Sequence, residues 1–124
     1  MKTVGIYISL VVGLLLNSSA SYADGNELLQ QCSEVVKIMD GKTTDDQFGA
    51  GYCIGLIDGV RTTLSAVREI SGNEAVIDTC IPENVNNGQA IRVVLAYLRA
   101  NPEKLHFDEG VLTIVALQEA FPCD

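Results

Sequence analysis

The chain has 124 residues, enough for one domain with a modest core, and its 16 acidic and 8 basic residues give a formal net charge of −8. This acidity disfavours nucleic-acid binding, because contacts with phosphates need a basic face, and it suits solubility and attraction to a basic partner. No repeat, low-complexity stretch or second domain interrupts the sequence.

The first 23 residues have the pattern of an export signal. Lys2 precedes an apolar run over residues 4–16, and the small residues Ser21 and Ala23 follow at the spacing of a cleavage site. The apolar run is too short to span a membrane, which takes about 20 residues. We expect cleavage near Ala23 and an exported domain over residues 24–124 that keeps no membrane anchor.

Two alternatives remain open, one to the position of the cut and one to the signal itself. Ser18 and Ala20 offer a second position for the cut. The apolar run is also compatible with a buried N-terminal helix of a cytosolic protein.

Four cysteines lie in the predicted mature domain: Cys32, Cys53, Cys80 and Cys123. An even number in an exported chain indicates two disulfides, which small secreted domains commonly use to supplement a small core. No two of them have the close spacing of zinc ligands, so we expect no metal.

Apolar spacing predicts a first helix over residues 26–39. Asp24 and Glu27 resemble a capping pair at its start, and Asp40-Gly41 ends it. Thr44 and Gln47 form a second such pair and predict a long helix over residues 45–70.

The acidic pair at the start of this long helix, Asp45-Asp46, is interpreted as a complement to the helix dipole. Its apolar positions are Phe48, Ile54, Ile57, Val60, Leu64 and Val67.

Residues 71–86 have the composition of a loop, with Ile81 and Val76-Ile77 tying it to the core. A third helix is predicted from Asn86 to the Asn101-Pro102 pair.

A last helix is predicted over residues 108–120. Asp108-Glu109 complements its dipole, and its almost wholly apolar centre places it in the middle of the bundle. The sequence therefore predicts an all-α fold, a small four-helix bundle with a long second helix and two disulfides.

Helix geometry favours one of the three possible disulfide connectivities. Cys32 and Cys53 lie at similar distances from the turn between helices one and two, so they are level in an antiparallel hairpin. Cys80 precedes the third helix and Cys123 follows the fourth, which brings these ends together if the two helices are antiparallel neighbours. The predicted pairs are Cys32–Cys53 and Cys80–Cys123.

Gly51, Gly55 and Gly59 recur every four residues within the long helix. Each costs up to about 1 kcal/mol of helix stability relative to alanine, so some close approach should offset them. Two interpretations are open: packing against another helix of the chain, or a contact between subunits. Asp58 and Arg61 exclude a membrane span here.

Catalytic residues are not apparent. His106 is the single histidine, and oxidised cysteines leave it no thiol nucleophile. No serine nucleophile elbow, zinc-protease motif or phosphate loop occurs. We therefore expect that the protein is not an enzyme and needs no cofactor.

Several segments together resemble the Rap/Tai-type immunity proteins of type VI secretion systems. They are residues 51–60 (GYCIGLIDGV), Cys80-Ile81-Pro82, Gln89, Tyr97-Leu98, Asn101-Pro102-Glu103, Ala116-Leu117 and Ala120-Phe121-Pro122-Cys123. The likeness covers most of residues 26–123. Leu56 and Asn101 depart from the family pattern, and neither touches the cysteine pattern.

The resemblance implies a periplasmic, all-helical and often dimeric protein. Its partner would be a peptidoglycan-cleaving amidase effector delivered by neighbouring cells, whose active-site cleft it plugs, protecting the cell from sibling or self intoxication. By analogy the plug is a loop at one end of the bundle, with Glu74, Asp78, Glu83 and Asn84 as candidate effector contacts. A solvated connector is the alternative interpretation of that loop.

Three other functional classes compete with an immunity protein. A small periplasmic chaperone, or an orphan protein-binding module, fits the same composition, and a chaperone of the acid-stress type would differ from an inhibitor by loosening at low pH. A lipid-binding bundle would need a continuous apolar cavity, and a small hydrolase would need an organised nucleophile and base.

Overall fold

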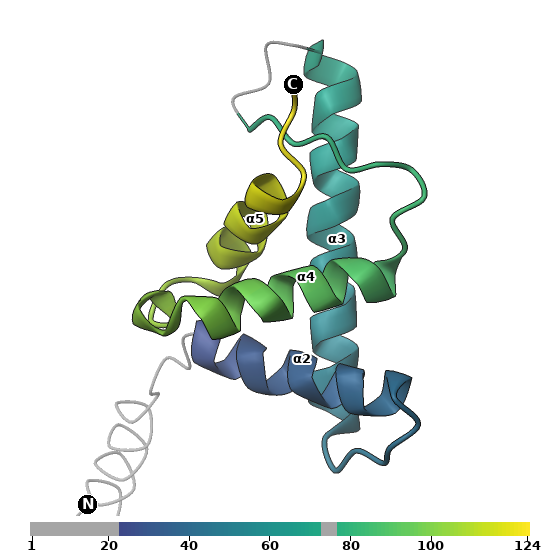
Figure 1. Cartoon of the computed structure of the whole chain (residues 1–124), viewed down its shortest axis with the longest axis vertical. Helices are drawn as coiled ribbons and strands as arrows, with labels where there is room; N and C mark the ends of the chain where they lie inside the picture. Colours follow the sequence, from purple (N-terminus) through teal and green to yellow (C-terminus); the bar gives the residue numbers. More distant parts are fainter. Residues whose placement is uncertain (1–22, 73–76) are drawn as a thin grey trace, which may run out of the picture.

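The computed structural model describes residues 23–72 and 77–124 (Figure 1). Within these ranges the chain forms four α-helices, one short 3₁₀ helix and no β-strand: α2 (Gly25–Met39), α3 (Gln47–Ser71), α4 (Asn87–Ala100), η2 (Pro102–Lys104) and α5 (Glu109–Ala120). The predicted all-α fold of four helices with a long second helix is confirmed. The predicted signal peptide lies, apart from Ala23, outside the described residues, and none of the described helices has the length and apolarity to cross a membrane.

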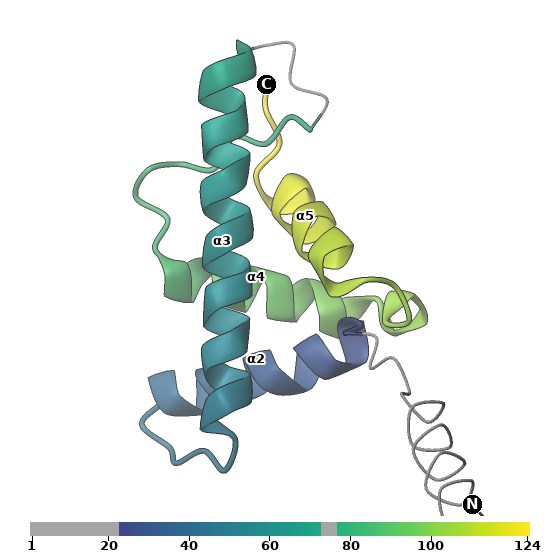
Figure 2. The same ribbon diagram turned by 180° about the vertical axis from the view of Figure 1, so that it is seen from behind.

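Helix α3 is the axis of the molecule. Figures 1 and 2 show α2 and α4 side by side across its N-terminal half, and α5 along its flank. The C-terminal half of α3 extends beyond α4, where residues 77–86 run across it and the end of the chain runs alongside it (Figures 1 and 2).

The core is centred on α4. Six of its fourteen residues are buried: Ala90, Ile91, Val94, Leu95, Tyr97 and Leu98. The prediction that the last helix lies in the middle is wrong, because α5 buries Leu112 and Leu117 on one face and leaves Val111 53% exposed on another. An all-round apolar helix at the flank of a domain leaves part of its apolar surface free.

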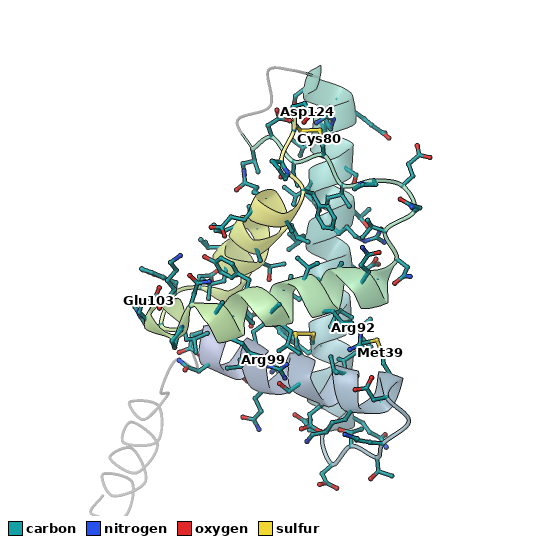
Figure 3. The ribbon with its side chains drawn as sticks, in the orientation of Figure 1. Met39, Cys80, Arg92, Arg99, Glu103 and Asp124 are labelled. Carbon is teal, nitrogen blue, oxygen red and sulfur yellow. A yellow bond between two sulfur atoms is a disulfide. The ribbon has the colours of Figure 1, made fainter. Side chains whose placement is uncertain are left out.

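Both predicted disulfides form. Cys32–Cys53 is fully buried and joins α2 to α3, with Cα atoms 5.3 Å apart. Cys80–Cys123 is partly exposed, with Cα atoms 5.0 Å apart, and joins the segment before α4 to the C-terminal tail near Asp124 (Figure 3).

Side-chain caps explain where the helices begin. Asp24 accepts hydrogen bonds from the N–H groups of Asn26 and Glu27, which lower the pKa of its carboxyl, and Asn86 accepts from Gln89 N as predicted.

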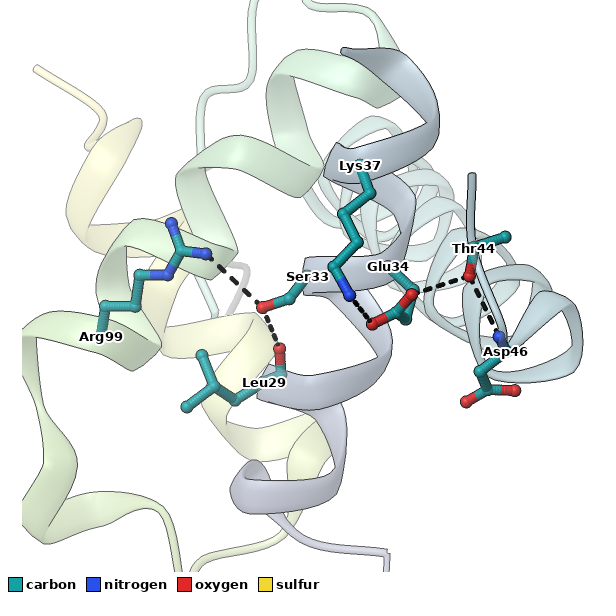
Figure 4. Close-up of polar contacts among 7 residues, drawn as sticks. All are labelled: Leu29, Ser33, Glu34, Lys37, Thr44, Asp46 and Arg99. Atoms are coloured by element: carbon teal, nitrogen blue, oxygen red, sulfur yellow. Dashed lines mark hydrogen bonds and ion pairs between the residues drawn. The ribbon is translucent and has the colours of Figure 1, made fainter. Parts of the chain in front are cut away.

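The start of α3 differs from the prediction. Asp46, rather than Thr44, caps this helix by accepting from Gly49 N at 2.7 Å. Thr44 instead donates to Glu34 of α2 at 2.7 Å and accepts from Asp46 N (Figure 4). Asp45 and Asp46 therefore precede the helix, and Asp46 acts through a direct hydrogen bond at the cap.

Candidate functional site

The described part of the predicted effector-binding loop, residues 77–86, contacts α3 through two arginines. The Arg61 guanidinium donates to the carbonyl oxygen of Val85 at 3.3 Å. Arg68 forms an ion pair with Asp78 at 3.1 Å and also contacts both sulfur atoms of the Cys80–Cys123 disulfide. Asp78 is thus engaged within the chain, and Glu74 lies outside the described residues.

The two other predicted contacts in this loop, Glu83 and Asn84, are exposed. Glu83 is at the edge of a mixed polar and apolar cavity of about 440 Å³ between the loop and α3, and Asn84 does not line it. Residues 77–86 therefore present Glu83 and Asn84 to solvent.

The three glycines of α3 lie on its exposed side. A Cβ atom built on Gly51, Gly55 or Gly59 meets no described atom within 4 Å outside the helix's own backbone. The interpretation that they pack against another helix of this chain is therefore wrong. The other interpretation, a contact between subunits, stays a prediction because it concerns a partner chain.

These glycines belong to a longer uncharged surface, here named the outer stripe. It consists of exposed residues that recur at helical spacing along α3: Phe48, Gly51, Tyr52, Gly55, Gly59, Thr63, Ala66 and Ile70. Phe48 and Ile70, near the two ends of the helix, are 84% and 85% exposed. This row of exposed uncharged residues is bordered by the exposed Asp58 and Glu69, and it is a candidate surface for contact with another molecule.

An apolar groove of about 600 Å³ adjoins the outer stripe. Its walls include Leu56, Gly59, Val60 and Val67 of α3, with Ile77 and Ile114 opposite. The groove lies between α3, α5 and the start of the segment that precedes α4.

A polar pair lies near the N-terminal end of the outer stripe, where α3 meets α5. The Tyr52 hydroxyl donates to Glu109 Oε1, and Glu109 is 5% exposed whereas Tyr52 is 38% exposed. The second carboxyl oxygen, Glu109 Oε2, is buried and has no hydrogen-bond partner among the described residues. Glu109 is an acid in the first turn of α5, as the sequence predicts, and its carboxyl is in addition buried in the protein.

The surroundings of Glu109 are acidic. Gly25 N donates to the carbonyl oxygen of Phe107 at 3.1 Å, which brings the N-termini of α2 and α5 together with Asp24, Glu27 and Asp108. Within residues 23–72 and 77–124, no ion pair involves any of these carboxylates.

These surroundings raise the pKa values of both Tyr52 and Glu109. Burial, and then the charges of Asp108, Glu27 and Asp24, raise the pKa of Glu109, although the bond from Tyr52 opposes this shift. The same bond raises the pKa of Tyr52 to about 12.

No sequence signal identifies this pair, because its members are 57 positions apart. Only the packing of α5 against α3 brings them together.

The described residues assemble no nucleophile and base. His106 stacks on Phe107 with ring centroids 4.2 Å apart, and all four cysteines are in disulfides. Asp78 and the sulfur atoms of Cys80 and Cys123 lie within 4.8 Å of one another, but these sulfurs share a disulfide and contact the Arg68 cation, which disfavours a metal ion.

Comparison with known proteins identifies a family. A family model described as Rap1a immunity proteins matches residues 24–123. No curated protein and no solved structure matches the chain.

Proposed function

The chain belongs to the Rap1a immunity protein family, and we propose that it protects its own cell by binding a type VI secreted peptidoglycan amidase and occluding its active site. The observation that carries this proposal is the extent of the match, which covers the whole of the folded domain. Immunity families are typically not enzymes, and a blocking role needs only a stable surface that fits the effector.

The proposed place of action is the periplasm, where an effector that cleaves peptidoglycan works. The export pattern of residues 1–23 supports this location. The two disulfides support it as well, because they form and persist in oxidising compartments.

The proposed assembly is a homodimer joined through the outer stripe. Glycines at helical spacing allow two backbones to approach closely, and a surface without charges avoids the repulsion that two acidic copies would otherwise experience. We expect Gly55→Leu to leave the monomer folded, because the space above Gly55 is open, and to shift the protein from dimer to monomer in light scattering.

The oligomer experiment has a matched control. Thr43→Leu adds a similar apolar side chain at an exposed position between α2 and α3, outside the outer stripe, and should leave the dimer unchanged. A dimer that persists in Gly55→Leu would exclude the outer stripe as the subunit contact.

A competition assay tests the function itself. The gene is deleted, and the mutant is grown on a surface with its own parent, with and without a working secretion system in the parent. We expect lysis of the mutant only by the secretion-competent parent, and rescue by the full chain. Survival of the mutant beside a parent whose system is shown to fire would contradict immunity.

A periplasmic chaperone or orphan binding module is the second candidate, and the apolar outer stripe and groove favour it. A chaperone of the acid-stress type should loosen and expose apolar surface at about pH 2–3, whereas an inhibitor held by two disulfides should stay folded. Near-ultraviolet circular dichroism and dye binding across this pH range separate the two.

A further inference from the structure

Only one of the two carboxyl oxygens of Glu109, Oε1, has a hydrogen-bond partner among the described residues, although both oxygens of a buried carboxylate need one. An unsatisfied buried polar atom is unfavourable in the free protein, and more so when the group is ionised. Glu27, whose charge acts on Glu109, accepts a hydrogen bond from Gln31 one turn later on α2. The Gln31 side chain is 8% exposed and leaves its own Oε1 without a donor in the described structure. This region therefore has buried acceptors in excess of donors.

We propose that the Tyr52–Glu109 pair receives a cationic side chain, an arginine or lysine, from the secreted effector. This inference rests on the proposed function and deepens it by naming the surface that meets the effector. It places the contact at the junction of α2, α3 and α5, on a different part of the molecule from residues 77–86.

A cation is the ligand that the charges select. Asp24, Glu27, Asp108 and Glu109 belong to this junction, and no described lysine or arginine neutralises them. A metal ion is disfavoured because, in the described part of the chain, these four carboxylates do not converge as a set of ligand atoms. An arginine would supply several N–H donors to acceptors that lack them.

The cation comes from a different protein rather than from a second copy of this chain. The outer stripe of α3 contains no lysine or arginine, so a second copy docked through it brings no positive charge to Tyr52. A strongly acidic inhibitor attracts a basic surface on its target.

Exposed apolar side chains flank the pair. Phe48 is one turn before Tyr52 on α3, and Phe107 and Val111 lie two residues either side of Glu109, with exposures of 84%, 50% and 53%. An incoming guanidinium would stack on the Tyr52 ring, and a rotation of this partly exposed side chain would uncover the carboxyl. Aromatic residues around a desolvated charge are typical of the centre of a protein interface.

The experiment uses the full chain with Glu109→Gln, which keeps the shape of the side chain and removes its charge. Glu103→Gln is the matched control, because Glu103 is exposed on η2, has no contact with Tyr52 or Glu109 among the hydrogen bonds and ion pairs of the described residues, and loses the same charge. Glu83→Gln tests the competing loop. Thermal unfolding confirms that each variant is folded.

Each variant is first placed in the deletion strain beside the secretion-competent parent. We expect Glu109→Gln to lose protection while Glu103→Gln and Glu83→Gln keep it. Full protection by Glu109→Gln would overturn the inference and leave the immunity function standing. If the strain without the gene is not lysed at all, the proposed function fails instead, and with it the assignment of the cation to an effector.

A titration with N-acetyl-arginine amide, followed by nuclear magnetic resonance, tests the site without the effector. The expected result is a saturable shift of the Tyr52 and Glu109 signals in the natural chain and in Glu103→Gln, and its loss in Glu109→Gln. A shift that is equal in all three proteins, or absent from the natural chain, would contradict a cation site at this pair.

Discussion

The Tyr52–Glu109 hydrogen bond joins a partly exposed phenol to a buried acid. The bond raises the pKa of Tyr52, and it lowers the pKa of Glu109 against the larger effect of burial. Tyr52 stays protonated because its pKa is raised to about 12. Glu109 resists ionisation because burial and three neighbouring acids raise its pKa. The folded protein therefore holds the Glu109 proton more strongly than the unfolded chain does.

This shift has a definite sign for stability. A carboxyl with a raised folded pKa stabilises the protein fully below its unfolded pKa, and the contribution is lost as pH rises through the folded value. Glu109→Gln removes this loss. We therefore expect its free energy of unfolding to exceed that of the natural chain by about 1 kcal/mol at pH 7, and to equal it at about pH 4.

Urea unfolding at the two pH values measures the difference, with Glu103→Gln as the control that should show no such change. Equal stability of Glu109→Gln and the natural chain at both pH values would mean that the buried carboxyl is not ionised in the free protein.

The glycines of α3 give a second test at the scale of single residues. Gly55→Ala and Gly59→Ala add a Cβ into open space and reduce the flexibility of the unfolded chain, so each should stabilise the monomer by about 0.5–1 kcal/mol. Gly49→Ala is the opposite control, because a Cβ there would collide with the Asp46 carboxylate that caps α3. The measurement is urea unfolding at protein concentrations where the chain is monomeric.

At the scale of elements, helix starts were predicted well where a cap contacts only its own helix. Asn86 binds Gln89 N, a contact between near neighbours that the sequence displays directly. Thr44 was misassigned because its hydroxyl is used by Glu34 on α2, ten positions away, so the cap of α3 passes to Asp46. Such competition depends on tertiary packing and leaves no local signal.

The burial of α3 and α5 was harder to predict than their existence. Apolar spacing identified Ile57 and Leu64, which are buried, but it also included Phe48 and Ile54, which are 84% and 40% exposed. Hydrophobic periodicity finds apolar residues without saying whether they face the core or an interaction surface. The candidate site was missed because the sequence around Glu109 indicates only an acid in the first turn of a helix and carries no sign that its carboxyl is buried.

The two disulfides should differ in their resistance to reduction. Cys32–Cys53 has no exposed surface, whereas Cys80–Cys123 is partly exposed and contacts the Arg68 cation, which favours the thiolate. Under limited dithiothreitol, alkylation and mass spectrometry should therefore detect Cys80 and Cys123 first. Arg68→Gln should slow this reduction, and prior labelling of Cys32 would contradict the expectation.

At the scale of the whole molecule, the crosswise packing presents three surfaces. Residues 77–86 run across the far half of α3, the outer stripe follows α3, and the acidic junction lies where α2 and α5 begin (Figure 2). Phe48 and Tyr52 belong to both the outer stripe and the junction, so a copy that contacts a second copy and an effector at the same time would pack on the part of the stripe from Gly55 to Ile70. Gly55→Leu and Glu109→Gln lie outside the shared residues and test the two surfaces separately.

The most direct test of the central claim is inhibition of peptidoglycan hydrolysis. The amidase effector recovered from the secretions of the parent strain is mixed with increasing amounts of the purified protein, and the release of peptide from isolated cell-wall sacculi is followed. We expect hydrolysis to stop once the protein matches the effector in molar amount, and to continue when an unrelated protein of equal charge is added. Undiminished hydrolysis in the presence of excess protein would contradict the account that this chain acts by occluding an amidase.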